Sequence, residues 1–186
     1  MVVQRPRFRW SVDDYEKMIE HGILTENHKV ELIRGEIVPK MPIGNPHAAC
    51  VKRLTRLFYS RAGGLATMSV QDPIRLADSE PETDFAVLVQ SADDYASRKP
   101  GPADILVVME VADSTVDFDR EVKGPLYAEN GIAEYWIVNL VDRCLEVHRQ
   151  PRPDGTYADV RTLPPGDSVS LVLLPPVTVA VADLIP

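Results

Sequence analysis

The sequence predicts a mixed α/β domain of the α+β class, in which helices flank a mixed β-sheet. Two apolar runs, 85–89 and 105–111, are joined by a polar loop rich in Ser, Asp, Pro and Gly, which indicates a pair of antiparallel strands. A segment with helical signals follows at 114–131, and the apolar strand 134–140 comes after it. A strand, a helix and a strand in this order normally form a right-handed parallel crossover. The sheet is therefore expected to contain both strand orientations.

The composition fits one globular domain with a sizeable core. The chain has 186 residues, of which 45% are hydrophobic and 26% are charged. We expect a single domain over residues 1–186, with a core at about 10–148 and antiparallel strands in 149–186. Cys50 and Cys144 show neither a metal-ligand spacing nor a disulfide pattern. No apolar run reaches the roughly 20 residues of a membrane span, so we expect a cytoplasmic protein without a membrane partner.

Two helices and a hairpin are expected before the central strands. A capping-box pattern at Ser11 starts a short helix that ends at Glu20. Residues 30–41 predict a hairpin with its turn at 34–35. The apolar spacing over 46–62 predicts a second helix. The other expected strands are short: 30–33 and 36–41 in the hairpin, 68–70 and 74–76 beside strand 85–89, and 144–150, 157–163 and 168–174 near the end.

Glu110 stands inside the apolar run 105–111, where a core strand should carry no carboxylate. Burying an ionised carboxylate is costly unless it is paired, hydrogen-bonded or bound to a metal. A strand end that frays into water is the alternative explanation. We favour a functional role, because Glu is rarely fully buried without a partner.

Asp84 opens the preceding strand and can lie beside Glu110. If the two strands pair antiparallel with Val89 opposite Ile105, the same register sets Asp84 opposite Glu110. Opposite residues on one face have β-carbons about 5 Å apart, a span that one divalent cation can bridge and that two bare carboxylates would resist. The sequence therefore predicts a cation site on this pair. Without metal, we expect Glu110→Gln to be neutral or stabilising, because it relieves like-charge repulsion.

The segment 114–131 is expected to be a helix that Pro125 kinks or restarts. Its possible N-terminal caps are Ser114, Thr115 and Asp117. The residues expected to face the sheet are Phe118, Val122 and Leu126. Asp119, Lys123 and Tyr127 form the adjacent stripe, so Lys123 borders the buried side. A catalytic amine and a solvated lysine paired with Asp119 both fit this position.

The chain also carries several motifs in a fixed order. EPETD, MEVADST and YAENGIAEYWIVN follow VELIRGEIV and PIGNPH, and a D-x-x-x-K pattern runs from Asp119 to Lys123. Together they resemble the Uma-two family of bacterial restriction-type endonucleases, within the PD-(D/E)XK nuclease superfamily. The resemblance covers about 10–148. It implies a restriction-endonuclease-like core and hydrolysis of DNA with Mg²⁺ or Mn²⁺ as the cofactor.

The resemblance also implies roles for individual residues. Carried over by motif, Asp84 and Glu110 hold the metal, and a lysine helps to activate water. The chain departs from the superfamily at two positions, because Thr83 stands where the proline would be and Ala112 stands where the lysine would be. Only Lys123, on the following helix, can supply that amine.

Four further residues are secondary candidates. Glu31 is an additional acidic candidate by resemblance, and a strand Glu that faces solvent explains it equally well. His47 should point toward the sheet from its helix, where a satisfied core histidine is the common case, and its place in PIGNPH makes it a candidate. Asp119 and Tyr127 share the stripe of Lys123.

The net charge of −8 and a pI near 5.0 mean that the whole molecule repels DNA at long range. Affinity for DNA would have to be local. Lys52, Arg53 and Arg56 lie on the outer side of the second helix and could contact phosphates, and a homodimer could build one basic cleft. A solvated helix face explains these residues equally well.

Two other functions compete with nuclease activity. A nuclease fold that acts as a binding or regulatory module without catalysis is the main alternative, and intact Asp84, Glu110 and Lys123 count against it. A hydrolase with Ser114 as the nucleophile is disfavoured, since no Gly-x-Ser-x-Gly elbow surrounds this serine.

Overall fold

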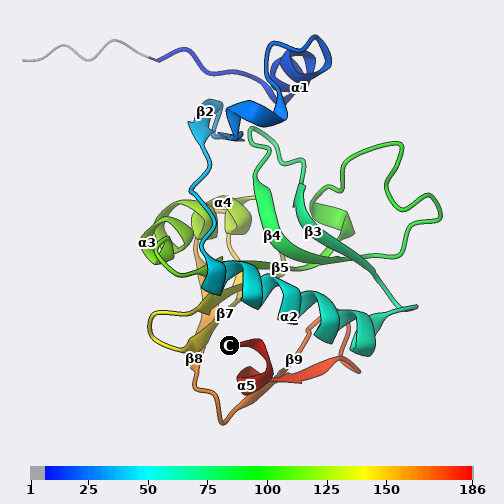
Figure 1. The fold of residues 1–186 in the computed structure, drawn as a ribbon, viewed down its shortest axis with the longest axis vertical. Helices are drawn as coiled ribbons and strands as arrows, with labels where there is room; N and C mark the ends of the chain where they lie inside the picture. Colours follow the sequence, from blue (N-terminus) through cyan, green and yellow to red (C-terminus); the bar gives the residue numbers. More distant parts are fainter. Residues whose placement is uncertain (1–6, 186) are drawn as a thin grey trace, which may run out of the picture.

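The computed structural model describes residues 7–185 and has a six-stranded mixed sheet at its centre (Figure 1). In spatial order, its strands are β3 (Thr67–Pro73), β4 (Glu82–Leu88), β5 (Ile105–Ala112), β6 (Glu134–Asn139), β7 (Cys144–Pro151) and β8 (Tyr157–Leu163). Neighbours are antiparallel except β5 and β6, which run parallel. The predicted mixed sheet and its parallel crossover are confirmed.

Helices cover both faces of this sheet. One face carries α2 (Asn45–Ala62), α5 (Val181–Leu184) and a small second sheet of β9 (Ser168–Ser170) and β10 (Thr178–Ala180). The other face carries α3 (Val116–Phe118), the π-helical turn η3 (Asp119–Lys123) and α4 (Gly124–Glu129). The buried side of α2 holds Val51, Leu54 and Phe58, as their spacing predicted. Within residues 7–185, no helix is both long and apolar enough to cross a bilayer.

The N-terminal elements form a small cluster beside the sheet. They are α1 (Val12–Glu20), η1 (Glu26–His28) and a hairpin of β1 (Val30–Ile33) and β2 (Glu36–Pro39). A further short helix, η2 (Pro102–Asp104), lies much later in the chain, directly before β5. Ser11 caps α1 with the predicted capping box. The hairpin turn puts Arg34 at φ 50° and Gly35 at φ 73°, the backbone that a tight two-residue hairpin turn requires. The predicted hairpin is confirmed.

The register of β4 against β5 is confirmed near the predicted site and wrong at the far end. Phe85 lies opposite Met109 and Val87 opposite Val107, as the predicted pairing requires. A β-bulge then shifts the register, so Leu88 rather than Val89 faces Ile105. The bulge leaves the end of the strand pair that carries Asp84 and Glu110 undisturbed.

Two predicted strands were wrong in extent. Residues 74–76 form no strand, because the chain leaves the ladder after Pro73. Of the segment 168–174, only Ser168–Ser170 is a strand, and it pairs with β10 instead of extending the main sheet. A turn through 174–177 causes this, since the Val177 N–H donates to the Leu174 carbonyl and folds the chain back on itself.

The buried stripe of the third helical segment was wrong at two of its three positions, and Leu126 is buried as expected. Phe118 and Val122 are half-buried, whereas Asp119 and Lys123 are buried. The π-helical turn explains the difference, because the Gly124 N–H reaches back five residues to the Asp119 carbonyl and rotates the side chains away from α-helical spacing. The helix restarts at Gly124, as Pro125 predicted.

Candidate active site

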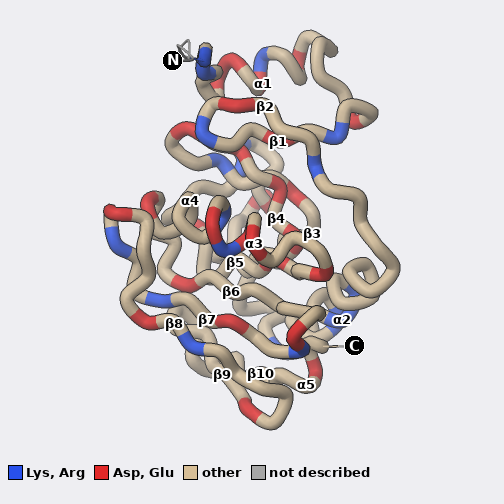
Figure 2. Tube along the Cα trace, turned by 90° about the vertical axis from the view of Figure 1, so that its left-hand side faces the viewer, with Lys and Arg blue, Asp and Glu red and all other residues tan. Residues whose placement is uncertain are grey.

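A cavity of about 700 Å³ opens beside β4, β5, η3 and the N-terminus of α2. It is called the acidic cavity below, because seven acidic side chains and three lysines line it. Acidic segments gather around β4 and α3 in Figure 2. Six of the predicted candidates line this cavity together: Glu31, His47, Asp84, Glu110, Asp119 and Lys123. The fold therefore brings together residues from five separate segments of the chain.

Glu110 is the most deeply buried of these carboxylates, at 1% exposure. Its Oε2 lies 2.9 Å from Lys123 Nζ, and its Oε1 accepts a hydrogen bond of 2.6 Å from the Tyr127 hydroxyl. Lys123 also donates to the Glu82 carbonyl at 3.4 Å. Because Glu110 is enclosed on a central strand, fraying into water does not explain it. Tyr127 lies behind the acidic cavity and holds Glu110 from the core.

Asp84 is held by two neighbours at the start of β4. Its Oδ2 accepts the Val111 N–H at 2.8 Å and lies 2.9 Å from His47 Nε2. The confirmed register of β4 and β5 brings the Val111 amide to this position. His47 is buried on the first turn of α2, and its Nδ1 has no hydrogen-bond partner among the described residues. His47 is thus a direct neighbour of the predicted metal ligand and not only a core histidine.

Asp119 and Glu31 complete the acidic wall. Asp119 begins η3, and its Oδ2 accepts a hydrogen bond of 2.7 Å from the Thr115 hydroxyl. Glu31 lies on β1 and accepts the Glu82 N–H at 3.1 Å. Glu31 is only 6% exposed, so the alternative of a solvent-facing strand residue does not hold.

The pKa values of this cluster reflect burial among like charges. Burial raises the pKa of Glu110 well above its usual value, Asp84 and Asp119 add to the shift, and Lys123 opposes it. Burial likewise raises the pKa of Asp119 to about 6, against the opposing charge of Lys123. For Lys123, burial lowers the pKa, but the surrounding carboxylates, Glu110 first, raise it overall. The lysine is therefore a charged hydrogen-bond donor and not a proton acceptor in this arrangement.

His47 follows the same balance. Burial alone would lower the pKa of His47, but its hydrogen bond and charge interaction with Asp84 outweigh burial and raise the pKa. The imidazole therefore favours its charged form and donates to Asp84. Asp84 thus has a cationic partner, as Glu110 has in Lys123.

The cluster fits a divalent cation in its chemistry. Carboxylate oxygens are the ligands that Mg²⁺ and Mn²⁺ prefer. Burial is the main cause of the raised pKa values of Glu110 and Asp119, and the negative charge of Asp84 adds to both shifts. However, no three His, Cys, Asp or Glu side chains of residues 7–185 converge on one metal position. In this conformation both oxygens of Glu110 are held by Lys123 and Tyr127.

The predicted phosphate-binding residues lie elsewhere on α2. None of Lys52, Arg53 and Arg56 lines the acidic cavity, and Arg53 and Arg56 instead line a separate depression beside Asp183. These three residues form no ion pair in the part of the chain that the structure describes. Their charges are therefore free to meet an external anion.

Three further groups of the site were missed by sequence reasoning. The Thr115 hydroxyl was considered only as a helix cap, although it lies four residues before Asp119, within reach on a helix. Lys40 follows β2, lines the acidic cavity and pairs with Glu82. The Val111 amide carries no side-chain signal. The positive charge near the end of the predicted hairpin 30–41 was the one signal for Lys40.

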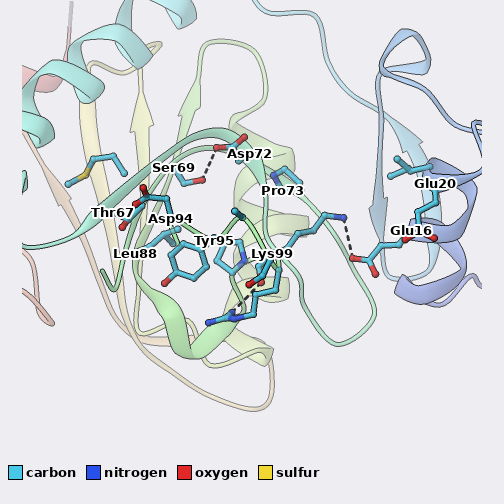
Figure 3. Close-up of a pocket in the computed structure, with 16 residues that line it drawn as sticks. Glu16, Glu20, Thr67, Ser69, Asp72, Pro73, Leu88, Asp94, Tyr95 and Lys99 are labelled. Carbon is cyan, nitrogen blue, oxygen red and sulfur yellow. Dashed lines mark hydrogen bonds and ion pairs between the residues drawn. The ribbon is translucent and has the colours of Figure 1, made fainter. Parts of the chain in front are cut away.

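A second cavity of about 550 Å³ lies between β3, α1 and the loop 94–100 (Figure 3). None of the predicted site residues lines it. Lys99 reaches across it to Glu16, and the Ser69 hydroxyl donates to Asp72 at 3.2 Å. Four acidic and two basic side chains line it, so its excess of negative charge is smaller than that of the acidic cavity, which has seven acidic side chains and three lysines.

Comparison with known proteins identifies the family and the fold. The profile of the Uma2 family, described as "Putative restriction endonuclease", matches residues 12–182. The fold is similar to the crystal structure of "a putative nuclease belonging to DUF820" from Anabaena variabilis ATCC 29413, with a TM-score of 0.72 and 15% sequence identity. That similarity covers 94% of this chain and 96% of the other. No curated protein sequence matches this chain.

Proposed function

Since the chain belongs to the Uma2 family of restriction-type endonucleases, we propose that it is a nuclease that hydrolyses DNA phosphodiester bonds with a divalent cation. The observation that carries this proposal is Glu110, a carboxylate buried on a central strand and facing Lys123 in a cavity that it shares with Asp84. A buried carboxylate in excess of its counter-charges is expected where a cation binds.

Each residue has a defined task in this proposal. Asp84 and Glu110 would hold Mg²⁺ or Mn²⁺, which polarises the phosphoryl oxygen and lowers the pKa of bound water. Lys123, as a charged donor, orients the attacking water or stabilises charge on the phosphate. His47 fixes the orientation of Asp84, and Tyr127 fixes that of Glu110.

DNA binding must overcome the overall charge of −8. The unpaired charges of Lys52, Arg53 and Arg56 on α2 are the proposed phosphate contacts. Affinity that depends on phosphate contacts falls steeply as salt rises, and each lost contact should reduce the salt slope by about 1. We therefore expect weak binding that is confined to low salt.

A second function is favoured by one specific observation. Both oxygens of Glu110 are held by Lys123 and Tyr127, and no three ligands converge on one point among residues 7–185. If this closed arrangement persists when metal and nucleic acid are present, the chain is a nuclease-fold binding module without catalysis. The two functions differ in metal affinity and in cleavage.

One experiment with two readouts tests the proposal. Isothermal titration with Mn²⁺ compares wild type, Asp84→Ala and Glu110→Gln, with Glu80→Gln as the control for loss of a buried carboxylate elsewhere. Wild type and the control should bind, and the two site variants should not. Equal binding by wild type and Glu110→Gln would show that the cluster is not a metal site.

The second readout is nicking of supercoiled plasmid in Mn²⁺. Lys123→Met should lower the rate by about 100-fold or more while leaving Mn²⁺ affinity nearly unchanged. Ala112 lies two residues past Glu110 on the same face of β5, so Lys123→Met with Ala112→Lys should restore part of the rate. Nicking by Lys123→Met at the wild-type rate would remove the lysine from the mechanism. A wild type that neither binds Mn²⁺ nor nicks the plasmid would instead support the binding module.

A further inference from the structure

The strand β8 ends the main sheet and leaves one side without a partner. Only β7 pairs with it, and no other segment of residues 7–185 joins its outer edge. The backbone groups of successive strand residues point alternately to the two sides. The Leu140 N–H at the end of β6 donates to the Ala112 carbonyl on β5, which fixes the residues of β6 whose backbone groups point toward β5. The registers of β6 with β7 and of β7 with β8 carry the same alternation to the edge. The backbone N–H and C=O groups of Val160 and Thr162 therefore point away from β7, toward the open edge.

The outer edge of β8 has only part of the usual protection against pairing, because its two charged residues, Asp159 and Arg161, are of opposite sign. Edge strands are commonly blunted by lysine or proline, and the seven residues of β8 contain neither. Val160, at the centre of the strand, is 54% exposed, and Ala158 and Thr162 on either side are exposed as well. A strand with these properties is a template for another strand.

Two copies of β8 that run antiparallel place residues of opposite charge opposite each other, because Asp159 and Arg161 flank Val160. We propose that β8 pairs antiparallel with β8 of a second copy of this chain, about a twofold axis at Val160, so that the two six-stranded sheets become continuous. In that register Asp159 lies opposite the partner's Arg161, and Arg161 lies opposite the partner's Asp159. Val160 meets its own copy, and Tyr157 lies opposite the partner's Leu163.

Charge selects this register over its neighbours. Moving the axis to Asp159 sets aspartate against aspartate, and moving it to Arg161 sets arginine against arginine, and like charges placed opposite each other are destabilising. Within one chain, Arg161 Nε already lies 2.8 Å from Asp159 Oδ1, so both side chains share one face. Pairing about Val160 would join the four side chains into a square of alternating charge.

This dimer goes beyond the proposed nuclease function and does not depend on it. Seven strand spacings would separate the two copies of β5, or about 34 Å before the twist of the sheet is considered. Each chain would therefore keep a complete acidic cavity of its own. Such a dimer differs from the single shared basic cleft that the sequence suggested.

Charge reversal of the two β8 residues tests the proposal. Sedimentation velocity over a concentration series should show a dimer for wild type. Arg161→Asp and Asp159→Arg, measured singly, should each weaken association by about tenfold or more, because both cross-strand pairs become repulsive. The double variant Asp159→Arg with Arg161→Asp should restore the dimer. An equimolar mixture of the two single variants should form a heterodimer, since Asp then faces Arg throughout.

A backbone variant separates edge pairing from side-chain charge. Val160→Pro removes an outward N–H and spares the ladder with β7, so it should give a folded monomer by circular dichroism and sedimentation. Arg161 is exposed and Asp159 is half-buried at the sheet edge, so we expect each charge-reversal variant to keep the fold, which circular dichroism checks. A wild type that is monomeric at its highest soluble concentration, or dimerisation that neither single variant weakens, would overturn the proposal.

Discussion

Among residues 7–185, two lysine–glutamate pairs have a buried glutamate, one at each cavity, and they differ in their surroundings. Lys123 lies 2.9 Å from Glu110, and Lys99 lies 2.5 Å from Glu80. Burial raises the pKa of both glutamates. The side chain of Lys99 is 29% exposed and also reaches Glu16, whereas that of Lys123 is 9% exposed.

The neighbours of each glutamate separate the two pairs further. Around Glu110, both Asp84 and Asp119 add negative charge. Around Glu80 the added charge comes from Glu16, whose own pKa is lowered because Arg75 and Lys99 outweigh the effect of its burial. A buried ion pair alone therefore does not mark a functional site. What marks it is a group of carboxylates that exceeds its local counter-charges.

The largest expected difference is in stability when each glutamate is neutralised. Without metal at pH 7, Glu110→Gln should lower the free energy of unfolding by about 3 kcal/mol, because it removes the carboxylate in direct contact with the buried Lys123 ammonium. Glu80→Gln should cost about 1 kcal/mol, since Lys99 keeps Glu16 and contact with water. Urea denaturation of both variants measures the difference. Equal losses would mean that the exposure of the lysine does not decide the cost.

This expectation reverses the one drawn from the sequence. Neutralising Glu110 was expected to relieve repulsion from Asp84 and to be neutral or stabilising. The structure places Lys123 against Glu110, so the same change now removes an attraction within the core. The difference shows how strongly a single unforeseen partner changes a prediction about a buried charge.

A smaller effect is expected in the pH dependence of stability, and Asp119 should show it. Its folded pKa of about 6 lies above its ordinary value of 3.8, so its stabilising contribution is complete below about pH 4 and is lost as pH rises through 6. In metal-free protein, Asp119→Asn should therefore gain up to about 2 kcal/mol relative to wild type between pH 4 and pH 7. Chemical denaturation across this range measures the gain.

Asp104 provides a control of opposite sign for this measurement. Hydrogen bonds from Arg98 lower the pKa of Asp104, and burial opposes this shift. The stabilising contribution of Asp104 is therefore present at pH values above its ordinary pKa and is lost as pH falls through its lowered pKa. Asp104→Asn should therefore lose stability relative to wild type at pH 7 and converge with it in acid. A flat difference for Asp119→Asn would show that its carboxylate is as free to ionise as an exposed one.

The strands around the site could be predicted because strand periodicity is regular. An assumed antiparallel register of two apolar runs placed Asp84 beside Glu110, and the pairing of Phe85 with Met109 agrees with that register. The bulge at Leu88 could not be foreseen, since it depends on how the strand leaves the sheet. For the strand residues near the site, the position predicted from the sequence agreed with the position in the structure.

The contacts between elements could not be predicted in the same way. Lys123 reaches Glu110 from a π-helical turn. The extra residue of this turn interrupts the α-helical periodicity from which a buried stripe is predicted. His47 meets Asp84 across 37 positions of sequence, so their approach depends on how α2 packs on the sheet. Such distances follow from tertiary packing, which periodicity in one segment does not encode.

The smallest expected effect concerns two tyrosine hydroxyls, one beside each cavity. The Tyr127 hydroxyl donates to the buried Glu110 at 2.6 Å, and the Tyr95 hydroxyl donates to the Val89 carbonyl at 2.8 Å near the surface. Tyr127→Phe should lower the free energy of unfolding by about 1–2 kcal/mol, because a buried charged acceptor loses a donor that water cannot replace. Tyr95→Phe should cost no more than about 0.5 kcal/mol, since solvent can reach the freed carbonyl. Thermal denaturation of the two variants in one buffer checks both values, and a larger loss for Tyr95→Phe than for Tyr127→Phe would contradict this ranking of the two hydrogen bonds.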